Sequence, residues 1–173
     1  MRIAVKNASG FTLIELLVAL VLLALLVSSA APLMQMTAKR NKEQELKKAL
    51  WQIRDAIDAY KQAVEDGSIK KSVDETGYPK SLRQLVDGVE NVQDANKRKI
   101  YFLRRIPRDP FAVDATLSAE DAWGKRSYES SFEEPNEGGD IYDVYSLSNE
   151  IGINQLPYRE WWCVKSIRSG LRW

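Results

Sequence analysis

Few side chains in this sequence could carry out chemistry. The chain of 173 residues contains no histidine and a single cysteine, Cys163. Without histidine it lacks the commonest general base and the commonest metal ligand at neutral pH. One cysteine forms neither an intrachain disulfide nor a cysteine-based zinc cluster, and no histidine is present to activate its thiol as a nucleophile. The composition therefore argues against an enzyme, and a net charge of +1 argues against nucleic acid as the main partner.

The residue whose position most needs an explanation is Glu15, the only charged residue in the 21-residue run from Phe11 to Ala31. An α-helix of that length spans roughly 30 Å, the thickness of the hydrocarbon layer of a membrane. An ionised carboxylate inside that layer costs about 2.5–3.5 kcal/mol, so it needs a counter-charge or a position near the membrane interface. Arg2 and Lys6 precede the run, which favours a cytoplasmic amino end.

Two interpretations of processing compete for this segment. In a secretory signal, the chain would be cut after the apolar core, at the small residues within 28–32. This apolar run is longer than a usual signal core, and an acid within it would hinder insertion. The other interpretation places the cut before the run, between Gly10 and Phe11. It rests on the residues GFTLIELLVAL (10–20), which resemble the class III signal of type IV pilins and type II secretion pseudopilins.

This resemblance implies roles for three residues. A prepilin peptidase would cut after Gly10, the last residue of a leader peptide spanning residues 1–10, and would methylate the new amino terminus at Phe11. Glu15 would then meet the amino terminus of a neighbouring subunit as subunits pack into a filament. A free amino terminus is a cation at a suitable depth, and Phe11 and Glu15 are one helical turn apart. A carboxylate resting at the cytoplasmic interface is the alternative explanation of Glu15.

One long helix is expected to carry this segment. Residues 11–36 would form its transmembrane half, with a kink at Pro32, whose ring removes a backbone hydrogen bond. Residues 37–66 contain no proline or glycine and would form an amphipathic periplasmic half that stops at Gly67. Apolar residues recur there at steps of three and four, which favours packing on a sheet of the same domain over binding in a partner's groove. They are Leu46, Ala49, Leu50, Ile53, Ala56, Ile57, Tyr60, Ala63 and Val64.

Residues 67–161 are expected to form the periplasmic globular part of the chain. A short helix is predicted from Ser81 to Val86, with Ser81 as its N-cap and Gly88 as its stop. Residues 88–99 are predicted to form a solvated loop because they are polar.

Two later segments favour strands. Residues 123–132 and the alternating run DIYDVYSL (140–147) have strand propensity and are separated by a polar turn, which predicts an antiparallel hairpin. The predicted fold class is therefore α+β and pilin-like, with a long N-terminal helix packed on a small antiparallel β-sheet.

The residues IPRDPF (106–111) followed by AWGKRSYES (122–130) also resemble major pseudopilins, in which a proline-rich turn precedes such a strand. The two prolines cannot donate hydrogen bonds to a sheet and so stiffen the turn. Basic and aromatic residues around this turn are open to two interpretations, binding of an anion or DNA and pairing with acids of other subunits. They are Arg104, Arg105, Arg108 and Phe111.

Many major pseudopilins bind calcium in the loop after the last strand, through backbone oxygens and aspartates. The corresponding stretch here offers Ser146, Ser148 and Glu150 as weak candidate ligands, and no second acid until Glu160. Calcium takes six to eight oxygens, usually with two or more carboxylates. We therefore expect no tight metal site and no required cofactor.

The same loop is expected to close in another way, by packing of Pro157, Tyr158 and Trp161 on the sheet. The resemblance ends near Trp161. Residues 162–173 form an aromatic and basic tail to which we assign no role.

The resemblance implies a structural subunit of a type II secretion pseudopilus. Copies would be stored in the bacterial inner membrane as single-pass proteins with the C-terminal domain in the periplasm, and would polymerise to drive protein export across the outer membrane. The expected partners are other copies of the chain in a helical filament, minor pseudopilins, the prepilin peptidase, the inner-membrane assembly platform and membrane lipid. The alternatives are a type IV pilin acting in adhesion, motility or DNA uptake, and a membrane-anchored periplasmic enzyme.

Overall fold

A computed structural model describes residues 10–161 of the chain except 113, 115 and 132, and describes residues 29–33 by their backbone alone. It contains two compact units, Met1–Arg40 and Asn41–Trp173. The leader residues 1–9, Cys163 and the tail 162–173 lie outside the described residues, as do the predictions made for them.

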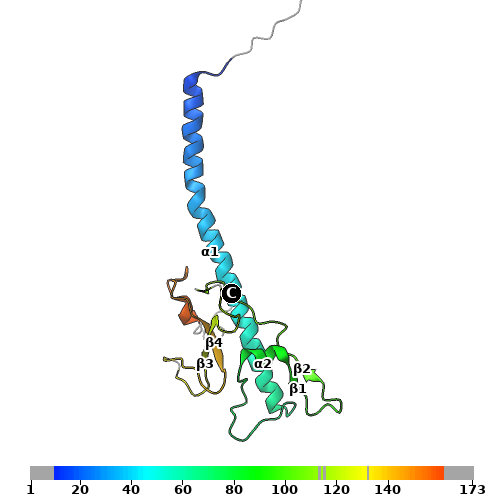
Figure 1. Cartoon of the computed structure of the whole chain (residues 1–173). Coiled ribbons are helices and arrows are strands. Elements are labelled where there is room, and N and C mark those ends of the chain that lie inside the picture. Colours follow the sequence, from blue (N-terminus) through cyan, green and yellow to red (C-terminus); the bar gives the residue numbers. More distant parts are fainter. Residues whose placement is uncertain (1–9, 113, 115, 132, 162–173) are drawn as a thin grey trace, which may run out of the picture. The chain divides into compact units, whose positions relative to one another are not determined.

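Helix α1 runs from Leu13 to Glu65, a length of 53 residues (Figure 1). Its range agrees with the predicted long helix, whose only proline is Pro32 and which contains no glycine. The helical backbone assignment includes Pro32, but its side chain is outside the described residues, so the kink stays a prediction.

The second half of α1 carries the predicted apolar stripe into the core. Leu46, Ile53 and Ile57 are fully buried, and the other members of the stripe are at most 9% exposed, except Ala63, which is partly buried. Each fully buried side chain of this size contributes roughly 1.5–3 kcal/mol. The stripe is therefore a core face of the Asn41–Trp173 unit, as its periodicity predicted.

Helix α1 ends in a hydrogen-bonded cap around Gly67, which has a φ of 75°. The amide of Gly67 donates to the carbonyl of Val64 (3.1 Å), and the amide of Ser68 donates to that of Ala63 (2.9 Å). This pair of bonds is the Schellman motif, which needs a left-handed residue at its bend and so favours glycine.

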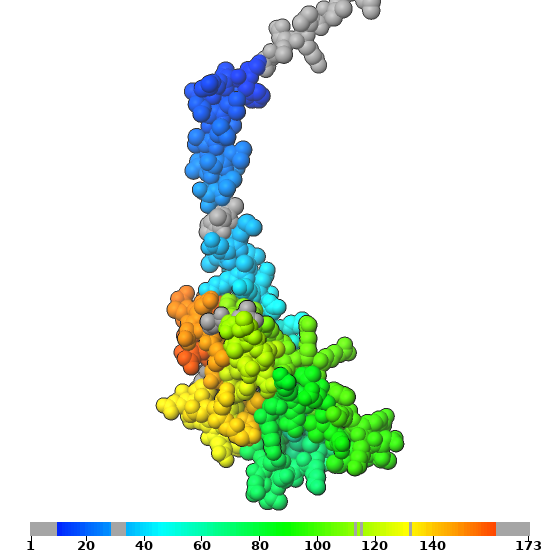
Figure 2. All heavy atoms as spheres, viewed as in Figure 1, coloured from blue at the N-terminus to red at the C-terminus, as the bar shows by residue number. Residues whose placement is uncertain are grey.

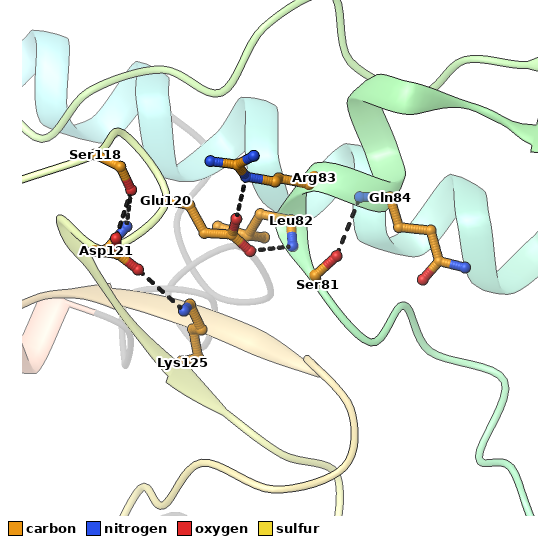
Figure 3. A network of polar contacts seen from close by, with 8 residues as sticks. All are labelled: Ser81, Leu82, Arg83, Gln84, Ser118, Glu120, Asp121 and Lys125. Atoms are coloured by element: carbon orange, nitrogen blue, oxygen red, sulfur yellow. Dashed lines mark hydrogen bonds and ion pairs between the residues drawn. The ribbon is translucent and has the colours of Figure 1, made fainter.

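The short helix α2 spans Leu82–Asp87, within one residue of the prediction. The Ser81 hydroxyl accepts a hydrogen bond from the Gln84 amide (3.3 Å), which confirms Ser81 as the N-cap. A second cap comes from a distant loop, because the Glu120 carboxylate accepts from the Leu82 amide (3.0 Å) and from Arg83 Nε (3.2 Å) (Figure 3). A carboxylate at the start of a helix is favourable for its dipole. The same helix buries Leu82 and Leu85 completely.

In the described part of the chain, the strands form two separate two-stranded antiparallel sheets rather than one. Strands β1 (Val89–Glu90) and β2 (Lys99–Ile100) pair with each other. The prediction of a solvated loop at 88–99 is therefore wrong at its two ends. A polar run of this kind carries no strand signal of its own. In the structure the half-buried Val89 and Ile100 lie opposite each other.

Strands β3 (Trp123–Arg126) and β4 (Asp143–Ser146) form the predicted hairpin, with Trp123 opposite Ser146. The first strand is shorter than the expected 123–132. Beyond Arg126 the backbone finds other partners, because the Ser127 amide donates to the Asn136 carbonyl (3.0 Å) and the Tyr128 amide to Asp140 Oδ1 (2.9 Å). These bonds replace the ladder that a longer strand would need.

A buried ion pair joins α1 to this hairpin. Arg54 Nε donates to Asp143 Oδ1 (2.6 Å), and Arg54 Nη2 donates to the Val144 carbonyl (3.0 Å). Both side chains are about one-tenth exposed. The long helix is thus packed on small antiparallel sheets, and the α+β, pilin-like fold class is confirmed.

Candidate assembly site at the start of α1

The predicted processing and assembly residues lie together where α1 begins. Gly10, Phe11 and Thr12 precede the helix, and Leu13 is its first residue. The Thr12 hydroxyl accepts a hydrogen bond from the Glu15 amide (3.4 Å), and the Thr12 carbonyl accepts from the amides of Glu15 (3.1 Å) and Leu16 (3.2 Å). Thr12 is therefore the N-cap of α1.

The structure shows one half of a capping motif, the bond from the Glu15 amide to the Thr12 hydroxyl, and no bond from the Glu15 carboxylate back to the Thr12 amide in the described residues. The residues T-L-I-E (12–15) have the spacing of a capping box, in which a glutamate three residues after a threonine cap can reach back to the cap's amide. A carboxylate in the first turn also interacts favourably with the helix dipole. The signal was visible in the sequence, and it means that helix capping and pairing with a neighbour must be separated by experiment.

The apolar residues after this cap are exposed. They belong to the blue segment of Figure 2, which shows one face of it. Phe11 and Leu13 are each 78% exposed, and every large apolar side chain from Ile14 to Val27 is more than half exposed. Monomeric soluble proteins rarely leave so large a contiguous apolar surface uncovered. Within the described part of the chain, no hydrogen bond or ion pair engages the Glu15 carboxylate.

Among the residues that the structure describes, none of the helices combines the length and the apolarity required to cross a bilayer.

The three calcium candidates lie in a chain of local hydrogen bonds. The Ser146 hydroxyl accepts from the Ser148 amide (3.1 Å), and the Ser148 hydroxyl accepts from the Glu150 amide (3.3 Å). Both serines are buried, while Glu150 is exposed. Across residues 10–161, with the gaps given above, no three acidic or thiol side chains gather as metal ligands. On donor chemistry these residues do not fit a calcium site.

The aromatic residues predicted to close this loop are buried as expected. Tyr158 is fully buried and Trp161 is 1% exposed. The Tyr158 ring stacks on Phe111 (3.9 Å between centroids) and meets the edge of Trp161 (5.0 Å). Pro157 pairs with Ile151 in an isolated β-bridge.

Of the basic and aromatic patch predicted near the proline-rich turn, the arginines Arg104, Arg105 and Arg108 line one groove, whereas Phe111 does not join them. Phe111 is 8% exposed and belongs to the core, and Arg108 donates to the carbonyls of Asp114 (3.3 Å) and Leu117 (3.2 Å). Arg104 and Arg105 remain exposed beside this groove of about 860 Å³, whose other wall is α1. That wall is of mixed charge, with the acids Glu45 and Asp55 and the base Lys48.

Asp109 is a buried carboxylate that the sequence analysis did not single out. It is 2% exposed, its Oδ1 accepts from the Phe111 amide (2.8 Å), and its Oδ2 has no hydrogen-bond partner in the described residues. Burial raises the pKa of Asp109, against smaller lowering effects of the Ser146 hydroxyl and the Phe111 amide. The ionised form is therefore unfavourable in the folded chain.

Replacing Asp109 with asparagine should stabilise the fold at neutral pH. A raised folded pKa means that the stability contributed by Asp109 is present below the unfolded pKa of about 3.9 and is lost as the pH rises through the folded pKa. We expect Asp109→Asn to gain on the order of 1 kcal/mol at pH 7, with no gain near pH 3. Urea unfolding of both proteins from pH 3 to pH 7 checks this. If the difference in free energy of unfolding between the two proteins did not change with pH, the prediction would be contradicted.

Comparisons with known proteins bear on the residues around Gly10. Residues 5–31 match the family model described as the prokaryotic N-terminal methylation motif. Over 109 residues the chain is 28% identical to the type II secretion system core protein G of Vibrio cholerae serotype O1. The aligned residues make up 63% of this chain and 69% of that protein. The chain is pseudopilin-like. The motif matched in this pseudopilin-like chain contains Gly10, Phe11 and Glu15 and ends one residue before Pro32. No solved structure matches the chain.

Proposed function

We propose that this chain is a structural subunit of a type II secretion pseudopilus and performs no chemistry of its own. A prepilin peptidase cuts it between Gly10 and Phe11 and methylates Phe11. The mature chains are anchored in the bacterial inner membrane by residues 11–36, with the C-terminal domain in the periplasm, and polymerise to drive protein export across the outer membrane.

The observation that carries this proposal is the arrangement at the start of α1. The methylation motif, residues 5–31, contains the start of a helix whose apolar side chains are exposed and whose only early charge is Glu15. Such a surface is stable in lipid or against copies of itself, and not in water. The similarity to a type II secretion core protein supports a secretion filament in particular.

The surroundings of Gly10 support a role in processing rather than in packing. A Cβ added at Gly10 would meet no atom within 4 Å, and Gly10 is not among the glycines with a positive φ. Neither space nor backbone conformation therefore requires glycine here. Recognition by a peptidase of the residue before its cut would explain the glycine, which the fold does not require.

Other copies of the chain are the main partners in this proposal. Their α1 segments cover one another's apolar surface, and the amino terminus of a neighbour supplies the counter-charge for Glu15. Arg104 and Arg105, which are exposed beside the groove, offer further contacts to acids of adjacent subunits. Minor pseudopilins, the inner-membrane assembly platform and membrane lipid complete the set of proposed partners.

The first test is the intact mass of the membrane-extracted protein, expressed with and without prepilin peptidase and followed by fragmentation of its amino end. We expect a chain that begins at methylated Phe11 only when the peptidase is present. Gly10→Val should abolish the cut, whereas Ser9→Ala, one residue earlier, should leave it unchanged. A chain that starts at Met1 in both cells, or after Ala30 or Ala31, would contradict the proposal.

A type IV pilin is the second candidate, because the methylation motif does not separate the two systems. Deleting the gene for this chain distinguishes a secretion pseudopilin from a type IV pilin. Loss of protein export with intact surface fibres supports secretion, and loss of surface fibres with intact export supports a pilus.

A further inference from the structure

The loop after β4, residues 147–161, has a compact fold of its own. Its backbone closes on itself through the Gly152 amide and the Leu156 carbonyl (2.8 Å), and through the Tyr158 amide and the Glu150 carbonyl (3.0 Å). This is the loop that the pseudopilin resemblance associates with calcium, and the described residues do not fit that ion. The loop is held on the rest of the fold by its own backbone and side chains.

Glu43 of α1 joins the loop to the long helix through its carboxylate. Glu43 Oε1 accepts a hydrogen bond from the Ile153 amide (2.7 Å) and another from the Tyr158 hydroxyl (3.0 Å). These partners are 110 and 115 residues away in the sequence. Glu43 is only 7% exposed, so its carboxylate is held by the loop rather than by water. Hydrogen bonds to an ionised acceptor are about twice as strong as neutral ones.

Neighbouring side chains support the same contact. Lys47, one helical turn after Glu43, lies over the Trp161 ring at 5.0 Å from its centroid. Tyr158 is held between Phe111 and Trp161. Burial and then the Glu43 carboxylate raise the pKa of Tyr158, so its phenol remains a proton donor at neutral pH.

Polar side chains of the loop are already engaged within it. Asn154 Oδ1 accepts from the Leu156 amide (3.2 Å), and Asn149 Oδ1 accepts from Arg159 Nη1 (3.4 Å). The hydroxyls of Ser146 and Ser148 accept backbone amides in the same way. A cation would have to displace these bonds to gather its ligands.

We propose that the Glu43 carboxylate replaces a metal ion in this protein, and that it fixes the 147–161 loop on α1 without calcium. The inference concerns only the Asn41–Trp173 unit and does not rest on the proposed role in secretion. Its failure would leave that role untouched.

The test measures hydrogen exchange at the Ile153 amide in the full-length chain in detergent micelles, in excess calcium and in excess chelator. In the unaltered chain the Ile153 amide should exchange at the same rate in calcium and in chelator. Glu43→Ala should accelerate exchange at Ile153 roughly 10- to 100-fold, as expected for a lost charge-assisted hydrogen bond, and calcium should not restore it. Glu45→Ala, an exposed acid on the same helix, is the matched control and should change nothing.

Protection of the Val144 amide in β4 reports whether each variant is folded. If Glu43→Ala does not fold, Tyr158→Phe keeps the ring and removes one of the two donors, and it should still accelerate exchange at Ile153. Faster exchange of the unaltered chain in chelator would show that a metal holds the loop and would overturn the proposal. The proposal would also be overturned if the Ile153 amide of Glu43→Ala or Tyr158→Phe exchanged at the same rate as in the Glu45→Ala control.

Discussion

Glu15→Ala should abolish filament assembly while leaving the cut after Gly10 intact. In the proposed filament, the carboxylate neutralises the amino terminus of a neighbouring subunit within an apolar core. Its removal leaves that cation unpaired in a medium where charges are unfavourable. We expect at least a tenfold loss of assembled filaments, measured by sedimentation and electron microscopy of material from cells that also produce the peptidase.

A comparison with Glu15→Gln separates assembly from helix capping. Glutamine has no charge but can occupy the same place in a capping box after Thr12. If pairing of charges is the role of Glu15, Glu15→Gln should fail to assemble like Glu15→Ala. Thr12→Ala, which removes the cap hydroxyl, should then assemble. If Glu15→Gln forms filaments as well as the unaltered chain does, the charge is not needed and the capping role is sufficient.

Arg54→Ala should lower the free energy of unfolding by about 3–5 kcal/mol, because it leaves a buried carboxylate without its partner. Arg54 and Asp143 are 8% and 7% exposed, and Arg54 also donates to the Val144 carbonyl at 3.0 Å. The change therefore removes two hydrogen bonds that join α1 to β4. Urea unfolding of the full-length chain in micelles, followed by the fluorescence of the buried tryptophans, measures the loss.

The ion pair between Arg83 and Glu120 provides the matched control. Its Nε–Oε2 distance is 3.2 Å, but the Arg83 side chain is 71% exposed. Arg83→Ala should therefore cost less than about 1 kcal/mol. Equal losses for Arg54→Ala and Arg83→Ala would show that burial does not distinguish the two pairs. The double variant Arg54→Leu with Asp143→Leu should be much less destabilised than Arg54→Ala alone, since no buried charge then remains.

Local signals in the sequence were enough to predict the helices and the motif. The stripe on α1 repeats with the period of a helix, so the spacing of its apolar residues identifies the members that are buried. Ser81 and Gly67 act through the conformation and hydrogen bonds of their own turn, which makes caps readable from residue type. The methylation motif is likewise contiguous, and so its resemblance to pseudopilins could be stated from residues 10–20 alone.

The tertiary structure decided the contacts between residues that are far apart in the chain. No rule of sequence spacing predicts these contacts, because the residues come together only when the chain folds. Examples are Arg54 with Asp143, Glu43 with Tyr158, and Glu120 with the start of α2. The pairing of β1 with β2 and the end of β3 at Arg126 were missed for the same reason, since strand pairing depends on which backbone groups a partner offers. The sequence by itself determined where the helices lie and what the amino-terminal motif is. Only the tertiary structure decided how buried charges are paired, because the cost of burying a charge depends on neighbours that the sequence order does not reveal.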